Sequence, residues 1–181
     1  MNEHLHKMVY ASLMSALIAA GAFVAIPVGP VPIVMQNMFV MLSGLLLGSR
    51  WGLAAICVYL LAGICGLPVF AGGTGGIGKL IGPTGGYLIG YIPAVYLIGM
   101  ISERFEGRLW IHSIALILAA MIVYVFGVLW LKTVSGMTLA KTLAVGMYPF
   151  LIGDAIKIAA AVLIAKSLRP IMERNSVHAS A

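Results

Sequence analysis

The acidic residues of this chain are few, and only one of them lies within an apolar run. Of the five Asp and Glu residues, Asp154 is surrounded by mainly apolar residues, and Lys157 follows three positions later. In a helix, this spacing puts both side chains on one face, where their charges can offset each other. The other four acids flank the apolar runs: Glu3, Glu103, Glu106 and Glu173. Because ionisable residues are costly in an apolar segment, the pair indicates a ligand site; the alternative is an ion pair that only locks its helix to its neighbours.

A glycine-rich run at residues 72–79 matches parts of two nucleotide-binding motifs. Residues 73–78 fit G-x-G-x-x-G, and residues 73–79 fit most of the phosphate-binding loop, but Leu80 replaces the hydroxyl that would bind magnesium. No βαβ pattern surrounds the run, so we expect no nucleotide site there. Thr-Gly-Gly occurs at residues 74–76 and again at 84–86. Such segments let the backbone approach a small ligand or let helices pack closely, and both interpretations stay open.

The elements that must position these residues belong in a membrane. The 181 residues are 62% hydrophobic and 9% charged, with a mean hydropathy of +1.09. Soluble domains carry about 25% charged residues, so this composition excludes a water-soluble enzyme and a nucleic-acid-binding domain. We therefore interpret the formal net charge of +6 as a signal of membrane topology, because Lys and Arg keep loops in the cytoplasm.

The apolar runs predict an all-α integral membrane protein that forms one membrane domain over residues 1–181. Six spans are expected, at residues 8–26, 33–48, 51–64, 87–101, 109–131 and 149–168, with a short amphipathic or re-entrant piece at 137–148. A cleavable signal peptide is the alternative for residues 1–25, but its apolar stretch is too long for a signal core.

The distribution of Lys and Arg gives the orientation of these spans. Three basic residues fall on one side, Lys79, Lys132 and Lys141, and seven on the other, Lys7, Arg50, Arg104, Arg108, Lys166, Arg169 and Arg174. This predicts that both termini are cytoplasmic. Counted from Pro149, the Asp154–Lys157 pair then lies in the outer half of the membrane, within reach of a ligand from outside.

Small residues repeat at four-residue spacing along the first predicted span. One stripe is Ala11 and Ser15, and the other is Ser12, Ala16 and Ala20. Such stripes allow close contact with another helix, either inside the bundle or in a partner protein. The four histidines have no second ligand at helical spacing within a span, so no metal site is expected. An intramembrane serine protease is also disfavoured, because no buried histidine is expected to accompany Ser43.

Several blocks of the sequence together resemble the BioY family, the biotin-binding substrate (S) components of energy-coupling factor (ECF) vitamin transporters. The blocks are Ile-Pro at 26–27, Val-Pro-Ile at 31–33, GLLLG at 44–48, GLPVFAGG at 66–73, GPTGGY at 82–87 and GDAIK at 153–157. The resemblance implies six helices in an S-component-like bundle, cytoplasmic termini, and a vitamin pocket in the outer half that the first and third connecting loops close.

The resemblance also implies roles for individual residues. Asp154 and Lys157 become pocket residues; Gln36 is a further polar candidate, and the others are Gly73, Thr74, Gly75, Gly76 and Tyr87. Asp154 would accept a ureido N–H of biotin, while Lys157 would meet either the ureido oxygen or the valerate carboxylate. Either stripe of the first helix would dock the membrane-embedded coupling subunit.

The implied role is that of a binding subunit rather than an enzyme. No cofactor is expected beyond biotin as the transported ligand, and two cytoplasmic ATPase subunits would hydrolyse ATP. The alternatives are a solitary or ion-coupled carrier of biotin and an S component for another small vitamin.

Overall fold

A computed structural model describes the backbone of residues 3–27 and 29–178 and the side chains of residues 4–27 and 29–172. The rest of the predicted domain, residues 1, 2, 28 and 179–181, lies outside the described residues. So do the side chains of four residues used in the sequence analysis, Glu3, Glu173, Arg174 and His178.

The described chain is mostly helical. The long helices are α1 (Glu3–Phe23), α2 (Gln36–Ile64), α4 (Gly85–Arg104), α5 (Leu109–Ser135) and α7 (Leu151–His178). Shorter pieces connect them: α3 (Ile77–Ile81), α6 (Leu139–Gly146) and a 3-10 turn, η1 (Tyr148–Phe150). Within the described residues, five helical stretches are long and apolar enough to cross a membrane. An all-α architecture of membrane-spanning helices is therefore confirmed at this level.

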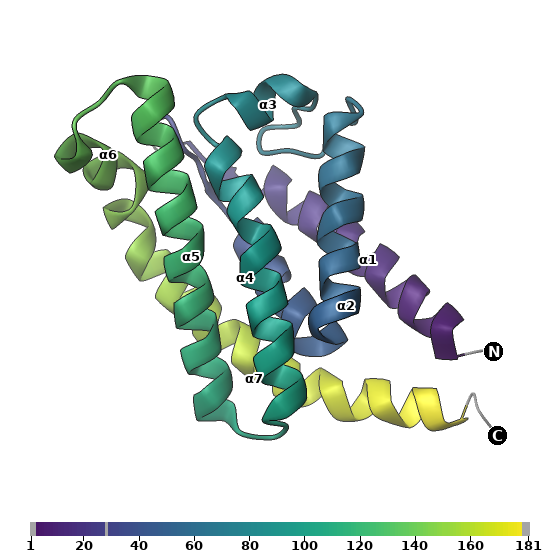
Figure 1. The fold of residues 1–181 in the computed structure, drawn as a ribbon. Helices are drawn as coiled ribbons and strands as arrows, with labels where there is room; N and C mark the ends of the chain where they lie inside the picture. Colours follow the sequence, from purple (N-terminus) through teal and green to yellow (C-terminus); the bar gives the residue numbers. More distant parts are fainter. Residues whose placement is uncertain (1–2, 28, 179–181) are drawn as a thin grey trace.

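Helix α2 is two antiparallel arms joined by a sharp bend. Gly48 has a φ of 76° and a ψ of −171°, a conformation that only glycine adopts easily. A Cβ on Gly52 would lie 3.0 Å from the Ser43 oxygen and 3.2 Å from the Gly44 Cα. In a straight helix, residues eight apart are separated by about 12 Å. The chain thus reverses at Gly48, as Figure 1 shows, and the arms correspond to the two segments predicted at 33–48 and 51–64.

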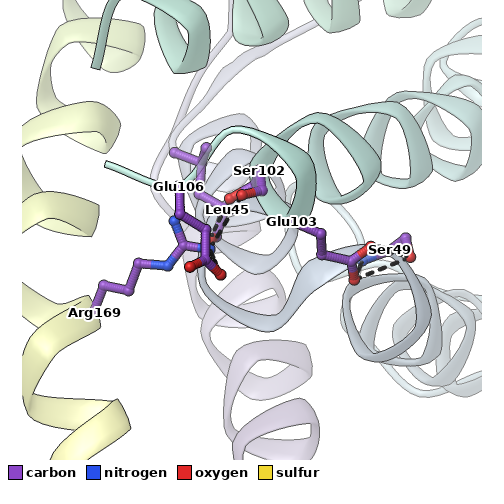
Figure 2. Close-up of polar contacts among 6 residues, drawn as sticks. All are labelled: Leu45, Ser49, Ser102, Glu103, Glu106 and Arg169. Carbon is purple, nitrogen blue, oxygen red and sulfur yellow. Dashed lines mark hydrogen bonds and ion pairs between the residues drawn. The ribbon is translucent and has the colours of Figure 1, made fainter. Parts of the chain in front are cut away.

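The last turn of α4 supplies the polar partners that this bend needs. The Glu103 carboxylate accepts hydrogen bonds from the Ser49 N–H (2.8 Å) and the Ser49 hydroxyl (2.9 Å), which open the second arm of α2. The Ser102 hydroxyl donates to the Leu45 carbonyl near the end of the first arm (3.0 Å). Figure 2 shows both contacts side by side. Backbone groups that a helix break leaves free are costly in an apolar medium, so α4 stabilises the bend directly.

The connection between α1 and α2 contains a small hairpin that the sequence analysis did not predict. Strands β1 (Ala25–Ile26) and β2 (Ile33–Val34) pair antiparallel, with Ala25 opposite Val34. The prolines of this segment indicated only a turn. They fall between the strands or at an edge, where the missing N–H breaks no ladder bond.

The boundaries of the last helix also differ from those predicted. Pro149 was expected to open it, but Pro149 lies in the 3-10 turn η1, and α7 begins two residues later at Leu151. The helix then continues past Pro170, beyond the predicted end at residue 168. Helix α6 occupies the segment expected to be a short amphipathic piece.

Helix α4 lies between α2 and α5 and forms the centre of the packed core. Gly99 faces the backbone of Ser49 so closely that any side chain there would collide with it. Where α4 packs against α5, a Cβ on Gly90 would lie 3.2 Å from the Val123 Cα of α5. Small residues thus bring the helix backbones together, as is usual where helices pack in lipid.

The two small-residue stripes of α1 have different surroundings. Ala11 and Ser15 are buried, and Ala11 packs in a cluster with Ala55 of α2. Ser12, Ala16 and Ala20 are exposed. The first stripe is therefore used inside the bundle, which leaves the second free on the outer surface.

The hydrogen bonds at the bend in α2 predict that removing the Glu103 carboxylate lowers the stability of the fold. Replacing Glu103 with Ala leaves the Ser49 N–H and hydroxyl without their acceptor, so we expect the free energy of unfolding to fall by about 1–2 kcal/mol, as for other lost helix caps. Reversible unfolding in mixed detergent micelles measures it. Glu106→Ala is the matched control, because its exposed carboxylate should contribute less than about 0.5 kcal/mol. Equal effects of the two variants would contradict this account of the bend.

Candidate functional site

The predicted charge pair is formed, and both of its members are buried. The Lys157 ammonium donates to Asp154 Oδ1 at 2.9 Å, and the two residues are 6% and 4% exposed. On α5, the Tyr124 hydroxyl donates to the other carboxylate oxygen, Oδ2, at 2.5 Å. Both oxygens of Asp154 are thus engaged, which lets a charged group lie in an apolar environment.

A cavity lies next to this pair, and α3 contributes to its wall. Helix α3 is at the end of the bundle away from the start of α1 (Figure 1). Its volume is about 130 Å³. Its walls come from the hairpin connection, the loop after α2, helices α2, α3, α4 and α5, and the turn η1. The residues that line it are Pro30, Val31, Pro32, Val34, Gln36, Asn37, Phe70, Ala71, Lys79, Pro83, Thr84, Tyr87, Leu88, Tyr91, Val123, Tyr124 and Phe150.

Asp154 lies just beyond the floor of this cavity. It lines a smaller adjoining hollow, and the side chains that line both spaces are Asn37, Tyr91, Val123 and Tyr124. Tyr124 therefore connects the cavity to the carboxylate through its hydroxyl. Lys157 lines neither space. The structure thus brings Asp154 close to the cavity and leaves Lys157 behind it.

Of the other predicted site residues, Gln36 and Tyr87 line the cavity, whereas Gly73, Thr74, Gly75 and Gly76 do not. The glycine loop is occupied with its own structure: the Thr74 hydroxyl donates to the Ala71 carbonyl at 3.0 Å. The Gly76 N–H donates to the Gly63 carbonyl at 2.7 Å, and Gly75 packs against the Leu67 backbone. These four residues were expected at the ligand; their close internal contacts instead direct Phe70 and Ala71 to the cavity.

The sequence of this chain matches known proteins over nearly its whole length. The profile of the BioY family matches residues 1–174. The chain belongs to the BioY family. It is 39% identical over 165 residues to the biotin transporter BioY of Thermotoga maritima, covering 91% of this chain and 96% of that protein. It is 42% identical over 172 residues to the biotin transporter BioY of Rhodobacter capsulatus, covering 86% and 89%.

A solved structure has the same fold as this BioY-family chain. It is the crystal structure of the S-component for biotin from an ECF-type ABC transporter, with a TM-score of 0.88 and 33% sequence identity. The match covers 93% of each chain. The resemblance drawn from the sequence blocks is thereby confirmed.

Several cavity residues of this BioY chain were missed by the sequence analysis. Tyr91, one helical turn after Tyr87, donates through its hydroxyl to the Asn37 side-chain oxygen. The Tyr87 hydroxyl donates to the Gly146 carbonyl at 2.7 Å. The four-residue spacing of the two tyrosines on α4 was a usable signal, because it puts both rings on one face. Asn37, Tyr124 and Lys79 had no such signal, since only their tertiary neighbours bring them here.

One polar group at the cavity of the BioY chain lacks a well-formed hydrogen bond. Gln36 is 2% exposed, and its amide lies near the Tyr59 hydroxyl, but its nitrogen Nε2 forms no hydrogen bond of ordinary distance and angle. A buried unpaired donor costs about 1–3 kcal/mol, so a ligand acceptor that reached it would be favoured. The walls combine this amide with tyrosine and phenylalanine rings and with one half-buried cation, Lys79. Such a site suits a small ligand with a polar ring, an apolar body and a negative charge.

The buried pair predicts strong coupling between its two members. Lys157→Met leaves Asp154 buried without its cation, and we expect the free energy of unfolding to fall by about 3–5 kcal/mol. The double variant Asp154→Asn with Lys157→Met removes both charges and should regain most of this loss. Unfolding in mixed micelles measures both, with the exposed Lys132→Met as control. Additive losses in the double variant would contradict the pairing.

Proposed function

We propose that this chain binds biotin in the cavity above Asp154 and serves as the substrate-binding S component of an ECF-type transporter. The observation that carries the proposal is the buried, doubly engaged carboxylate beneath an aromatic cavity in a chain of the BioY family. The named relatives are biotin transporters, and the solved structure with the same fold is an S-component for biotin.

The chemistry of the cavity supports an orientation for biotin. The ureido ring faces the floor, where Asp154 accepts a ureido N–H and the Gln36 amide donates to the ureido oxygen. The thiolane ring contacts apolar side chains such as Phe70 and Val123. Lys79, in the wall formed by α3, pairs with the valerate carboxylate. Lys157 pairs with Asp154 from behind rather than touching the vitamin, which agrees with its absence from the cavity wall.

The proposed topology has six crossings, with both termini in the cytoplasm. The two arms of α2 give six antiparallel segments in all, and α1 begins at the end of the bundle where α7 finishes (Figure 1). Basic residues near that end outnumber those near α3 and α6. This orientation opens the cavity to the outside, where the vitamin arrives.

The proposed partners are a membrane-embedded coupling subunit and two cytoplasmic ATPase subunits. The stripe of Ser12, Ala16 and Ala20 supports docking on α1, because it is exposed along its length. Ala11 and Ser15 are buried in the bundle and are not available to a partner. The glycine run at 72–79, which matches nucleotide-binding motifs only in part, ends in the five-residue helix α3 and contributes Lys79 to the vitamin cavity. ATP hydrolysis is therefore assigned to the partners.

Ligand binding can be tested on the purified protein with a panel of vitamins. We expect tight binding of biotin alone, and Asp154→Asn should weaken it by about 1–3 kcal/mol, the cost of a lost buried hydrogen bond. Lys79→Ala should weaken the binding of biotin but not of its methyl ester, because the ester lacks the negative charge. Asp154→Asn should weaken the binding of both ligands. Lys132→Ala, which removes an exposed lysine that does not line the cavity, is the control.

Two results of that experiment would count against the proposal. Preference for another vitamin would reject biotin as the ligand. Unchanged biotin affinity in Asp154→Asn would move the ligand away from the floor of the cavity.

If the coupling subunit docks on this stripe, a substitution there should abolish biotin uptake without affecting biotin binding. Ala16→Leu should abolish ATP-driven uptake by the assembled transporter and leave biotin binding by the isolated chain intact, because a large side chain on the exposed stripe holds a partner helix away. Ala159→Leu, the same change at an exposed site on α7, is the control. Uptake that persists without ATPase subunits and collapses with the proton gradient would instead identify an ion-coupled carrier.

A further inference from the structure

Asn37 lies at the floor of the vitamin cavity and has no role in the proposed function as described so far. It is the second residue of α2 and lines both the cavity and the adjoining hollow that contains Asp154. The other polar side chains of that hollow are Tyr91, Tyr124 and Asp154, and the rest of its lining is apolar. An amide in such surroundings makes strong hydrogen bonds, and its orientation decides whether it offers a ligand its oxygen or its NH2 group.

The Tyr91 hydroxyl of α4 sets the orientation of this amide. Tyr91 is 4% exposed, and its hydroxyl donates to the Asn37 side-chain oxygen Oδ1. Among the described residues, neither of these two side chains has another hydrogen-bond partner. A buried hydroxyl needs an acceptor, so the Asn37 oxygen, rather than its nitrogen, must face Tyr91. The Asn37 NH2 group then points away from Tyr91 and is the group left for a ligand.

The ureido oxygen of biotin suits a second amide donor. A carbonyl oxygen has two lone pairs and can accept two hydrogen bonds. In the proposed orientation of biotin, the Gln36 amide supplies one of them. The two amides have different neighbours: Gln36 lies near Tyr59 of the second arm of α2, whereas Asn37 is bonded to Tyr91 of α4. Asn37 is therefore held independently of Gln36 and can supply the second donor.

From these observations we propose that Asn37 donates a hydrogen bond to the ureido oxygen of biotin, and that Tyr91 is the positioning residue that keeps the Asn37 amide turned for this contact. This role rests on the proposed function, because it requires biotin with its ureido ring at the cavity floor. The consequence is selectivity for a carbonyl at this point of the ligand. A ligand with an N–H group in place of the ureido oxygen brings donors together and leaves the Asn37 amide without an acceptor.

Two ligands that differ at this one position provide the test. In 2-iminobiotin, a nitrogen that carries hydrogen replaces the ureido oxygen of biotin. Calorimetry gives the dissociation constants of both ligands for the full chain purified in detergent. We expect the unchanged protein to prefer biotin. Asn37→Leu removes the donor, so it should weaken biotin binding about tenfold and lower the ratio of the two affinities by a similar factor.

Tyr91→Phe tests the positioning role, because it keeps the Asn37 amide but lets it turn its oxygen toward the ligand. This variant should lower the affinity ratio by about threefold to tenfold. Tyr96→Phe, the same change at an exposed tyrosine of α4, is the matched control and should leave the ratio as it is. A simple loss of packing would weaken both ligands equally and would not change the ratio.

Asn37→Asp reverses the chemistry of the contact. Its carboxylate still accepts from Tyr91 and presents a second acceptor oxygen to the ligand, so it should bind 2-iminobiotin more tightly than the unchanged protein does.

The outcomes separate the two roles from the proposed function itself. An unchanged affinity ratio in Asn37→Leu, or weaker binding of 2-iminobiotin by Asn37→Asp while biotin still binds, would overturn the Asn37 contact. An unchanged ratio in Tyr91→Phe would overturn the positioning role. Absence of biotin binding by the unchanged protein would overturn the proposed function together with both roles.

Discussion

A carboxylate and an ammonium inside a helix that lies in lipid are stable only when each has a partner, and much of this structure follows from that requirement. Lys157 supplies one partner of Asp154 from the same helix, and Tyr124 supplies the other from α5. The Tyr124 contact joins α5 to α7 and constrains the rotation of one helix against the other. It also places Tyr124 at the boundary between the carboxylate and the vitamin cavity, so the stabilising network and the proposed binding site share a side chain.

The same requirement explains the bend in α2. A chain that reverses at Gly48 leaves backbone groups free on both sides, and two consecutive residues of α4, Ser102 and Glu103, satisfy them. Against this background of paired groups, the unpaired ones become informative. The Gln36 amide nitrogen is buried and forms no hydrogen bond of ordinary geometry. Gln36 lies at the vitamin cavity and is the basis of a ligand contact proposed here.

Much of the fold could be predicted because helices in lipid depend on local sequence. The apolar runs indicated the long helices, and the short loop around Arg50 indicated that residues 33–64 form two arms. The hairpin of β1 and β2 escaped because its strands have two residues each and pair across a proline-rich turn. At the site, Asp154 was singled out because a charge in an apolar run is rare. Gln36 and Tyr87 line the cavity, whereas the residues of the glycine loop do not, because their backbone groups bond within the loop.

The sequence by itself determined the class of protein, the approximate helices and the Asp154–Lys157 pair, because hydropathy and a three-residue spacing act over a few turns of one helix. Only the tertiary structure decided that Ala11 and Ser15 face the core while Ser12, Ala16 and Ala20 face outward, since both stripes consist only of Ala and Ser. It likewise brought Asn37, Lys79 and Tyr124 to one cavity. Their meeting depends on how three distant segments pack against one another, and no local pattern in the sequence encodes that contact.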